Sequence, residues 1–140
     1  MPGRYRFLEH TADVLFEAYG KNFREALENA AEAMFSVMCE IGKLKEEKSF
    51  VIEEEADSLE NLTVFTLSAI LSESEIEEVL PKRFKVEKFA QRNGIFRIGG
   101  RVYGSRWENG KVKTCIKAVT HHLIKVERNG KFTVRVLLDI

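Results

Sequence analysis

Two acidic residues, one near each end of the chain, are of the type that binds metal ions. Asp13 lies in EHTADV (residues 9–14), and Asp139 lies in LLDI, the last four residues. Ca²⁺ and Mg²⁺ prefer carboxylate and carbonyl oxygens as ligands, and the α-carboxylate of Ile140 follows one residue later. If the two acids meet in the fold, they form an anionic oxygen site. The spacing alone favours a simpler interpretation, in which Asp13 caps a turn and Asp139 is solvated.

The histidines and the common enzyme motifs add little to this signal. His10 lies between two expected strands, where it is a base, a metal ligand or a residue that orders the turn by hydrogen bonding. His121 and His122 are neighbours, and neighbours on a strand point to opposite faces, so the pair disfavours a zinc site. The sequence has no GxSxG, P-loop, GxGxxG or HExxH motif. These residues therefore do not predict a catalyst.

The composition predicts one domain that spans residues 1–140. With 140 residues, 44% of them hydrophobic, the chain can bury one core but not two. Lys and Arg total 22, as do Asp and Glu, so charge does not favour direct binding of RNA or DNA. There is no apolar run of about 18 residues and no apolar leader, so we expect a soluble cytoplasmic protein. Cys39 and Cys115 lack a CxxC spacing and are expected to be reduced and buried.

Two segments have the period of helices that pack on a sheet. After Asn22, apolar residues recur at intervals of three and four, and Gly42 is expected to end this helix. Asn22 and Glu25 have the spacing of a capping box, in which the Glu25 carboxylate accepts the amide hydrogen of Asn22. Asp57 and Glu60 predict a second capping box at the start of the second helix.

The other segments have strand character. Asn-Gly pairs at 93–94, 109–110 and 129–130 separate apolar runs, which is a strong hairpin signal. Helices with an apolar stripe beside strands joined by hairpins predict an α+β fold. We expect a two-layer sandwich, with two helices packed on a largely antiparallel β-sheet. The expected strands are residues 4–9, 13–19, 49–55, 83–91, 94–103, 111–120, 122–128 and 132–139.

The order of four segments makes the chain similar to a known family. EHTADV is followed by EAYG with REALENAAEAMFSVM, then by KAVTHHLIKVE, and finally by VRVLLDI. In this combination the chain resembles archease. The resemblance covers both ends and the last β region, whereas residues 43–100 contribute little to it.

The resemblance implies an accessory protein, not an enzyme, that activates an RtcB-type RNA ligase, the GTP-dependent enzyme that joins tRNA halves after intron removal. Such a protein promotes guanylylation of the ligase's active-site histidine, allows multiple turnover and modulates nucleotide use. The resemblance implies only indirect contact with tRNA and no membrane partner. The family's divalent-metal site, expected to hold Ca²⁺ with Mg²⁺ or Mn²⁺ as alternatives, corresponds to Asp13, Asp139 and Ile140.

Three further residues are candidates for ligase activation. Glu25 matches an acidic family position early in the first helix, and this role competes with its place in the capping box. Lys117 lies in the matched segment KAVT, where its ammonium group is either near the acidic site or solvated on the outer face of a strand. His10 belongs to the matched segment EHTADV.

The stretch before KAVT departs from the family pattern. GRVYGSRW keeps Gly100 and Arg106 but has Arg101, Gly104 and Trp107 where relatives often carry other polar groups. The role of this loop is therefore open. Trp107 is a candidate anchor for a partner protein, because Trp is enriched at interface hot spots.

Two other functional classes stay open from the sequence. A metal-dependent phosphohydrolase or nuclease would use Asp13, Asp139 and His10, and it would act on RNA or nucleotides by itself in Mg²⁺ or Mn²⁺. A general chaperone would reduce the aggregation of unrelated proteins, and a plain calcium-binding module would only hold the ion. Ligase turnover with and without the protein separates these classes.

Overall fold

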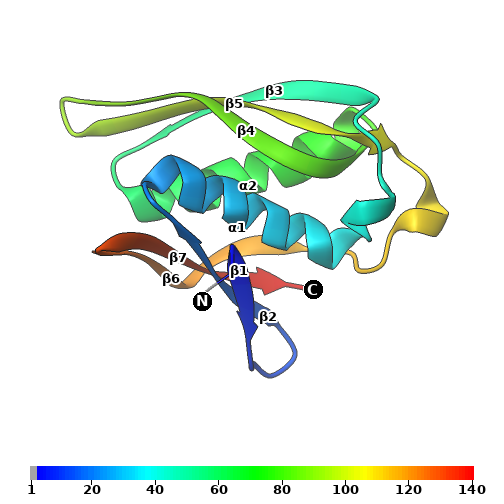
Figure 1. The fold of residues 1–140 in the computed structure, drawn as a ribbon, viewed down its shortest axis with the longest axis horizontal. Helices are drawn as coiled ribbons and strands as arrows, with labels where there is room; N and C mark the ends of the chain where they lie inside the picture. Colours follow the sequence, from blue (N-terminus) through cyan, green and yellow to red (C-terminus); the bar gives the residue numbers. More distant parts are fainter. Residues whose placement is uncertain (1–2) are drawn as a thin grey trace.

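The computed structural model describes residues 3–140, whose strands form two antiparallel sheets with two helices between them (Figure 1). The first sheet has the strand order β1-β2-β7-β6, and the second has the order β3-β5-β4. The elements are β1 (Tyr5–Leu8), β2 (Val14–Gly20), α1 (Phe23–Met38), η1 (Ile41–Lys43), β3 (Lys48–Ala56), α2 (Leu59–Ile76), β4 (Val79–Arg92), β5 (Ile95–Arg106), η2 (Asn109–Lys111), β6 (Ala118–Asn129) and β7 (Lys131–Asp139).

Both helices are largely buried, because they lie between the two sheets and each helix contacts both of them. α1 packs on β2 and β7 of the first sheet and on β4 of the second, and α2 packs on β6 and on β3. α2 carries buried residues around most of its circumference, which is typical of a helix enclosed by other elements. The predicted α+β class is confirmed. The strands form two sheets instead of one, so the helices are the middle of three layers and not one side of a two-layer sandwich.

The start of α1 follows the prediction more closely than the start of α2. The side chain of Asn22 accepts the amide hydrogen of Glu25 at 2.9 Å, as expected. The Glu25 carboxylate accepts from the amide of Lys21, not from that of Asn22. At α2 the predicted box is wrong by one residue, because Ser58 is the cap and Asp57 instead accepts from the side chain of Asn61.

The end of α1 also differs from the prediction. The helix ends at Met38 with Cys39 as its cap, and the predicted terminator Gly42 lies in the following 3₁₀ turn η1. Cys39 is buried, which raises the pKa of its thiol to about 11. Cys115 is exposed, so the prediction that it is buried is wrong.

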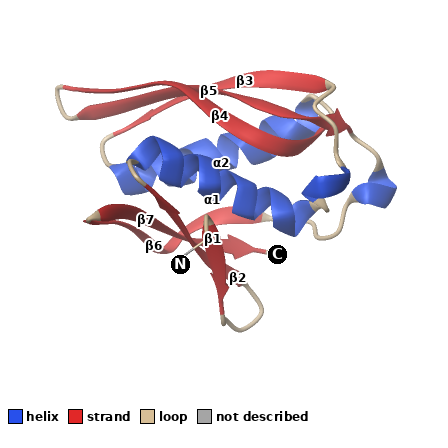
Figure 2. Cartoon of the chain, viewed as in Figure 1, coloured by secondary structure: helices blue, strands red, loops and turns tan. Residues whose placement is uncertain are grey.

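Two of the three predicted hairpins form. Asn93 and Gly94 both have positive φ between β4 and β5, and Gly130 has positive φ between β6 and β7, as tight hairpin turns require. Asn109 and Gly110 instead lie in the 3₁₀ turn η2, on the long connection from β5 to β6 (Figure 2). The expected hairpin is absent there because the chain after it pairs with the end of α1, where Val112 bridges Cys39.

The segment that was expected to form strands 111–120 and 122–128 forms one strand, β6. It begins at Ala118 and contains an irregularity between Thr120 and Lys125, where Leu123 takes a positive φ of 61°. The irregularity lies where the two expected strands, residues 111–120 and 122–128, were predicted to meet. None of the helices among residues 3–140 is long and apolar enough to cross a membrane.

Candidate functional site

The register of the first sheet brings Asp13 and Asp139 to the same place. Val14 of β2 pairs with Leu138 of β7 in an antiparallel ladder. Asp13 directly precedes Val14 in the loop before β2, and Asp139 directly follows Leu138 as the last residue of β7. Two acids that are far apart in sequence therefore lie at the same end of the first sheet.

Two of the other predicted residues lie at the same end. The Nδ1 atom of His10 is 3.9 Å from Oδ2 of Asp13, and both side chains are about one third exposed (30% and 32%). The backbone amide of Lys117 donates to the carbonyl of Asp139 at 2.7 Å, next to the pair of Ala118 with Asp139. His10 and Asp13 are therefore neighbours, and Lys117 and Asp139 are joined through their backbones, at the same end of the first sheet.

The loop between β1 and β2, which contains Asp13, has an unusual backbone conformation at one residue. Ala12 has a φ of 67°, in the left-handed region. For a residue with a Cβ this conformation costs about 1–2 kcal/mol, and such residues persist where the surrounding structure fixes them, often at functional sites. Sequence reasoning missed this feature, because the position carries neither Gly nor Asn.

The donor atoms at this end suit a hard divalent cation. Two carboxylates and the main-chain oxygens of Ile140 make an oxygen-only set, which Ca²⁺, Mg²⁺ and Mn²⁺ prefer. Across residues 3–140, His, Cys, Asp and Glu side chains nowhere form a group of three or more that could hold a metal. His10, Asp13 and Asp139 therefore do not form such a group in this structure, and a cation held by the two carboxylates would need main-chain oxygen and water to complete its shell.

Glu25 does not belong to this group. It lies in the first turn of α1, directly after the Gly20 end of β2, and its carboxylate accepts from Lys21 at 3.0 Å. β2 runs from Val14 to Gly20, which at a rise of about 3.3 Å per residue spans about 20 Å. The capping role of Glu25 is thus visible, and its carboxylate lies at the other end of the strand from Asp13.

An ion-pair network on the same strands was not predicted from the sequence. The carboxylate of Glu17 in β2 lies between two arginine side chains. Nη2 of Arg135 is 3.0 Å from one of its oxygens, and Nη2 of Arg6 is 3.5 Å from the other. Burial alone would raise the pKa of Glu17, but the hydrogen bond and charge of Arg135, with smaller contributions from Tyr19 and Arg6, together lower the pKa below its ordinary value. This network ties β1, β2 and β7 together beside the site.

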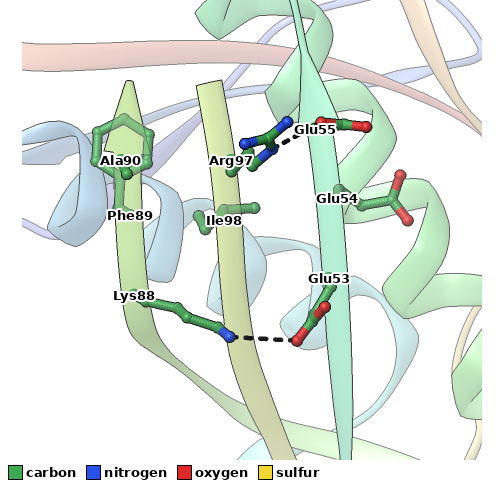
Figure 3. Close-up of a pocket in the computed structure, with 8 residues that line it drawn as sticks. All are labelled: Glu53, Glu54, Glu55, Lys88, Phe89, Ala90, Arg97 and Ile98. Carbon is green, nitrogen blue, oxygen red and sulfur yellow. Dashed lines mark hydrogen bonds and ion pairs between the residues drawn. The ribbon is translucent and has the colours of Figure 1, made fainter. Parts of the chain in front are cut away.

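One hollow lies on the other sheet and contains none of the predicted site residues. Its volume is about 620 Å³, and β3, β4 and β5 line it (Figure 3). Four of its five charged side chains form ion pairs, since Lys88 pairs with Glu53 at 3.4 Å and Arg97 pairs with Glu55 at 2.8 Å, and Glu54 belongs to neither pair. Desolvation raises the pKa of Glu54 in the same strand. Because both basic side chains of this hollow are already paired with acids, they are not available to bind a charged ligand.

Known proteins match the chain over nearly its whole length. Residues 5–140 match the model of the archease protein family. Protein archease of Methanosarcina mazei is 36% identical over 140 residues, covering 98% of this chain and 96% of the relative. Protein archease of Pyrococcus furiosus is 33% identical over 141 residues, covering 98% and 99%.

Solved structures share the fold. The solution structure of Methanobacterium thermoautotrophicum protein 1598 has a TM-score of 0.87 and 29% identity, covering 98% of this chain and 99% of that one. The crystal structure of a Thermotoga maritima archease, described as a possible chaperone, has a TM-score of 0.61 at 21% identity, covering 95% and 94%. The chain therefore belongs to the archease family.

Proposed function

We propose that this protein is a non-catalytic activator of an RtcB-type RNA ligase, and that it acts through the end of the first sheet. The observation that supports the proposal is the β2–β7 register, in which Val14 pairs with Leu138, so that the neighbouring Asp13 and Asp139 lie at the same end of the first sheet. These acids belong to the two sequence segments that carry the resemblance to archease. The proposed working surface consists of Asp13, Asp139, Ile140, His10 and Lys117.

The residues of this surface have distinct roles in the proposal. Asp13 and Asp139, with the main-chain oxygens of Ile140, would hold a divalent cation, with Ca²⁺ first and Mg²⁺ or Mn²⁺ as alternatives. When bound, the cation supplies positive charge that neutralises phosphate oxygens. The ammonium of Lys117, an exposed residue, would add a second positive charge. His10 lies within ion-pairing distance of Asp13 and would hold the orientation of that carboxylate.

Activation of a ligase by such a surface is a matter of positioning. Guanylylation requires the phosphates of GTP to lie in line with the histidine nucleophile, with their charge neutralised. An acidic end bounded by rigid strands would fit against the ligase near its nucleotide site. Glu25 is left out of this surface, because its carboxylate caps the loop before α1.

The proposal also covers the domain organisation, the location and the partners of the protein. Residues 1–140 would act as one domain in the cytoplasm, the ligase would be the direct partner, and tRNA would be contacted only through the ligase. The chain would stimulate nucleotide transfer without performing it.

The test is a reconstituted ligation reaction. Purified RtcB-type ligase, tRNA halves, GTP and Mn²⁺ are combined with and without this protein, and ligated product per ligase is measured. The proposal predicts that the protein raises both the guanylylated fraction of the ligase and the number of turnovers. Unchanged guanylylation and turnover at equimolar protein would contradict it. Hydrolysis of RNA or GTP by the protein alone would instead support the hydrolase class.

A further inference from the structure

β6 forms a long open edge of the first sheet (Figure 1). It pairs with β7 on one side, and within residues 3–140 there is no strand on its other side. Its last part, from Lys125 to Asn129, is regular, because the irregularity of the strand ends at Lys125. Hydrogen bonds within the described chain leave the backbone groups on the open side of this part unpaired. An edge of this kind is a template for another strand.

The other sheet edges of the described chain are short or protected. At the β4 edge, side chains of α1 take the place of a strand. The Glu28 carboxylate accepts from the amide of Val86 at 2.8 Å, and Arg24 donates to the carbonyl of Val86 at 3.1 Å. β1 has only four residues. β3 carries glutamates at residues 53–55, a run of one charge that protects an edge strand from pairing.

The charges on the open part of β6 alternate in sign. Lys125 and Glu127 lie two positions apart and therefore on the same face of the strand, and their side chains are 48% and 51% exposed. They pair with each other at 2.6 Å within the chain. Val126 lies between them and packs against the core from the other face. A second, antiparallel copy of β6 would offer each charge a further partner of opposite sign.

Two-fold symmetry and charge together select one register for such a pairing. Residues directly opposite each other share a face of the sheet. Centred on Lys125, the pairing would oppose lysine to lysine, and centred on Glu127 it would oppose glutamate to glutamate. Centred on Val126, it opposes Lys125 of each copy to Glu127 of the other. Opposite charges stabilise a cross-strand pair and like charges destabilise it, so the register centred on Val126 is favoured.

Exposed apolar side chains accompany this edge. Phe65 of α2 and Leu123 of β6 are each 39% exposed. The ring of Phe65 contacts that of His121, with centroids 6.0 Å apart, and α2 packs along β6, so Phe65 lies beside the edge. A two-fold axis at Val126 would place both copies of α2 on the same face of a joined sheet. Apolar surface beside the edge would then be removed from water, which favours association.

We propose that two copies of this chain associate through their β6 edges, antiparallel and centred on Val126. The two four-stranded sheets then join into one, in the order β1-β2-β7-β6-β6-β7-β2-β1. The same patch serves on both copies, as a closed two-fold dimer requires.

The dimer leaves the proposed working surface free on both copies. Val126 pairs with Val134 of β7, and Asp139 lies five residues further along the same strand. At a rise of about 3.3 Å per residue, the centre of the interface is about 17 Å from the end of the sheet where Asp13 and Asp139 lie.

Charge reversal tests the register directly. Lys125→Glu makes both charges of the open part acidic, and Glu127→Lys makes both basic, so each variant opposes like charges at two symmetric pairs. Association, measured by sedimentation equilibrium, should weaken by about tenfold in each variant. An equimolar mixture of the two variants should restore association, because an acidic edge then faces a basic one. The double variant Lys125→Glu/Glu127→Lys should associate as wild type does.

Two further variants separate this interface from general effects. Glu53→Lys is the matched control, since Glu53 is an exposed acid on β3, an edge strand of the other sheet. It should leave association unchanged. Phe65→Ser should weaken association without altering any charge, because it removes apolar surface beside the edge. Circular dichroism of each variant shows that the domain is folded.

The proposal is overturned by a wild-type protein that sediments as a monomer at every concentration, which would leave the edge to a strand of another protein. It is also overturned if the mixture of Lys125→Glu and Glu127→Lys associates no better than either variant alone. Equal weakening by Glu53→Lys would show an interface at β3 or a general effect of charge. None of these measurements uses a ligase, so failure here is distinguishable from failure of the proposed function.

Discussion

Leu138 of β7 pairs with Val14 of β2, and this pair sets which residues meet at the end of the first sheet. The register is determined by the core, because Phe16 and Leu138 are both fully buried against the helices. A slip of one residue would turn every side chain of the strand to the opposite face. The position of Asp13 and Asp139 at the same end of the first sheet is therefore a consequence of apolar packing and does not depend on any attraction between the acids.

The first prediction concerns metal binding. Two facing carboxylates repel each other when no cation neutralises them, so Ca²⁺ should stabilise the fold. At a concentration one hundred times the dissociation constant, the gain would be about 2.7 kcal/mol. Thermal melts with Ca²⁺ and with EDTA measure it. Asp13→Ala should abolish the difference between the two melts.

The matched control for that experiment is Asp57→Ala. Asp57 is an exposed aspartate beside α2, where it accepts from the side chain of Asn61. This variant should keep the full response to Ca²⁺. A response that vanishes in Asp57→Ala, or survives in Asp13→Ala, would place the cation elsewhere.

The second prediction separates the two roles of Glu25. Glu25→Gln still offers an oxygen to the amide of Lys21, so its melting temperature should change little. Because the carboxylate lies at the far end of β2 from Asp13, ligase guanylylation should also be unchanged. Glu25→Ala removes the cap and should cost about 0.5–1 kcal/mol of unfolding free energy. A slower guanylylation rate with Glu25→Gln would add Glu25 to the working surface.

The third prediction concerns pH. The Glu17 side chain is largely buried, and its pKa is lowered, since Arg135 with Tyr19 and Arg6 together outweigh the desolvation of the carboxylate. Its contribution to stability is therefore complete above the ordinary glutamate pKa of about 4.3 and is lost as pH falls through the lower folded-state pKa. Glu17→Gln should cost about 1 kcal/mol at pH 7 and much less near pH 3. Urea unfolding at pH 7 and near pH 3 measures the difference in unfolding free energy between wild type and Glu17→Gln.

A surface ion pair provides the control for this pH effect. Glu55 pairs with Arg97 at 2.8 Å while 60% of its side chain is exposed. Glu55→Gln should change stability by less than about 0.5 kcal/mol at either pH. A gap between wild type and Glu17→Gln that widens as pH falls would contradict the account of Glu17.

The fourth prediction tests the three-layer core. Leu27 in α1 is fully buried between the two sheets. Leu27→Ala should lower the unfolding free energy by about 2–5 kcal/mol, because it leaves a cavity. Urea unfolding measures the loss. Ligase activation per folded molecule should remain, and its loss in folded protein would contradict the separation of core and site.

The features that local sequence controls were predictable. The cap by Asn22 and the turn at Asn93-Gly94 depend on residues next to each other, and both form as expected. Asn109-Gly110 has the same local preference, yet its flanks do not face each other, because Val112 bridges Cys39 at the end of α1. A turn signal predicts a hairpin only where the strands on both sides pair.

The candidate site residues were named from the sequence, but their arrangement in space was not predictable. Asp13 and Asp139 lie in sequence segments that carry the family resemblance, whereas their position at one end of the first sheet depends on pairing between β2 and β7 at opposite ends of the chain. Such long-range order has no local signal.

The central claim, that Asp13 and Asp139 carry ligase activation, is tested most directly by the guanylylation rate of the ligase with each variant. Asp13→Ala and Asp139→Ala should each reduce the stimulated rate to that of the ligase alone, while their circular dichroism spectra and melts in EDTA match wild type. Asp57→Ala should stimulate as wild type does. Full stimulation by both Asp13→Ala and Asp139→Ala would contradict the account.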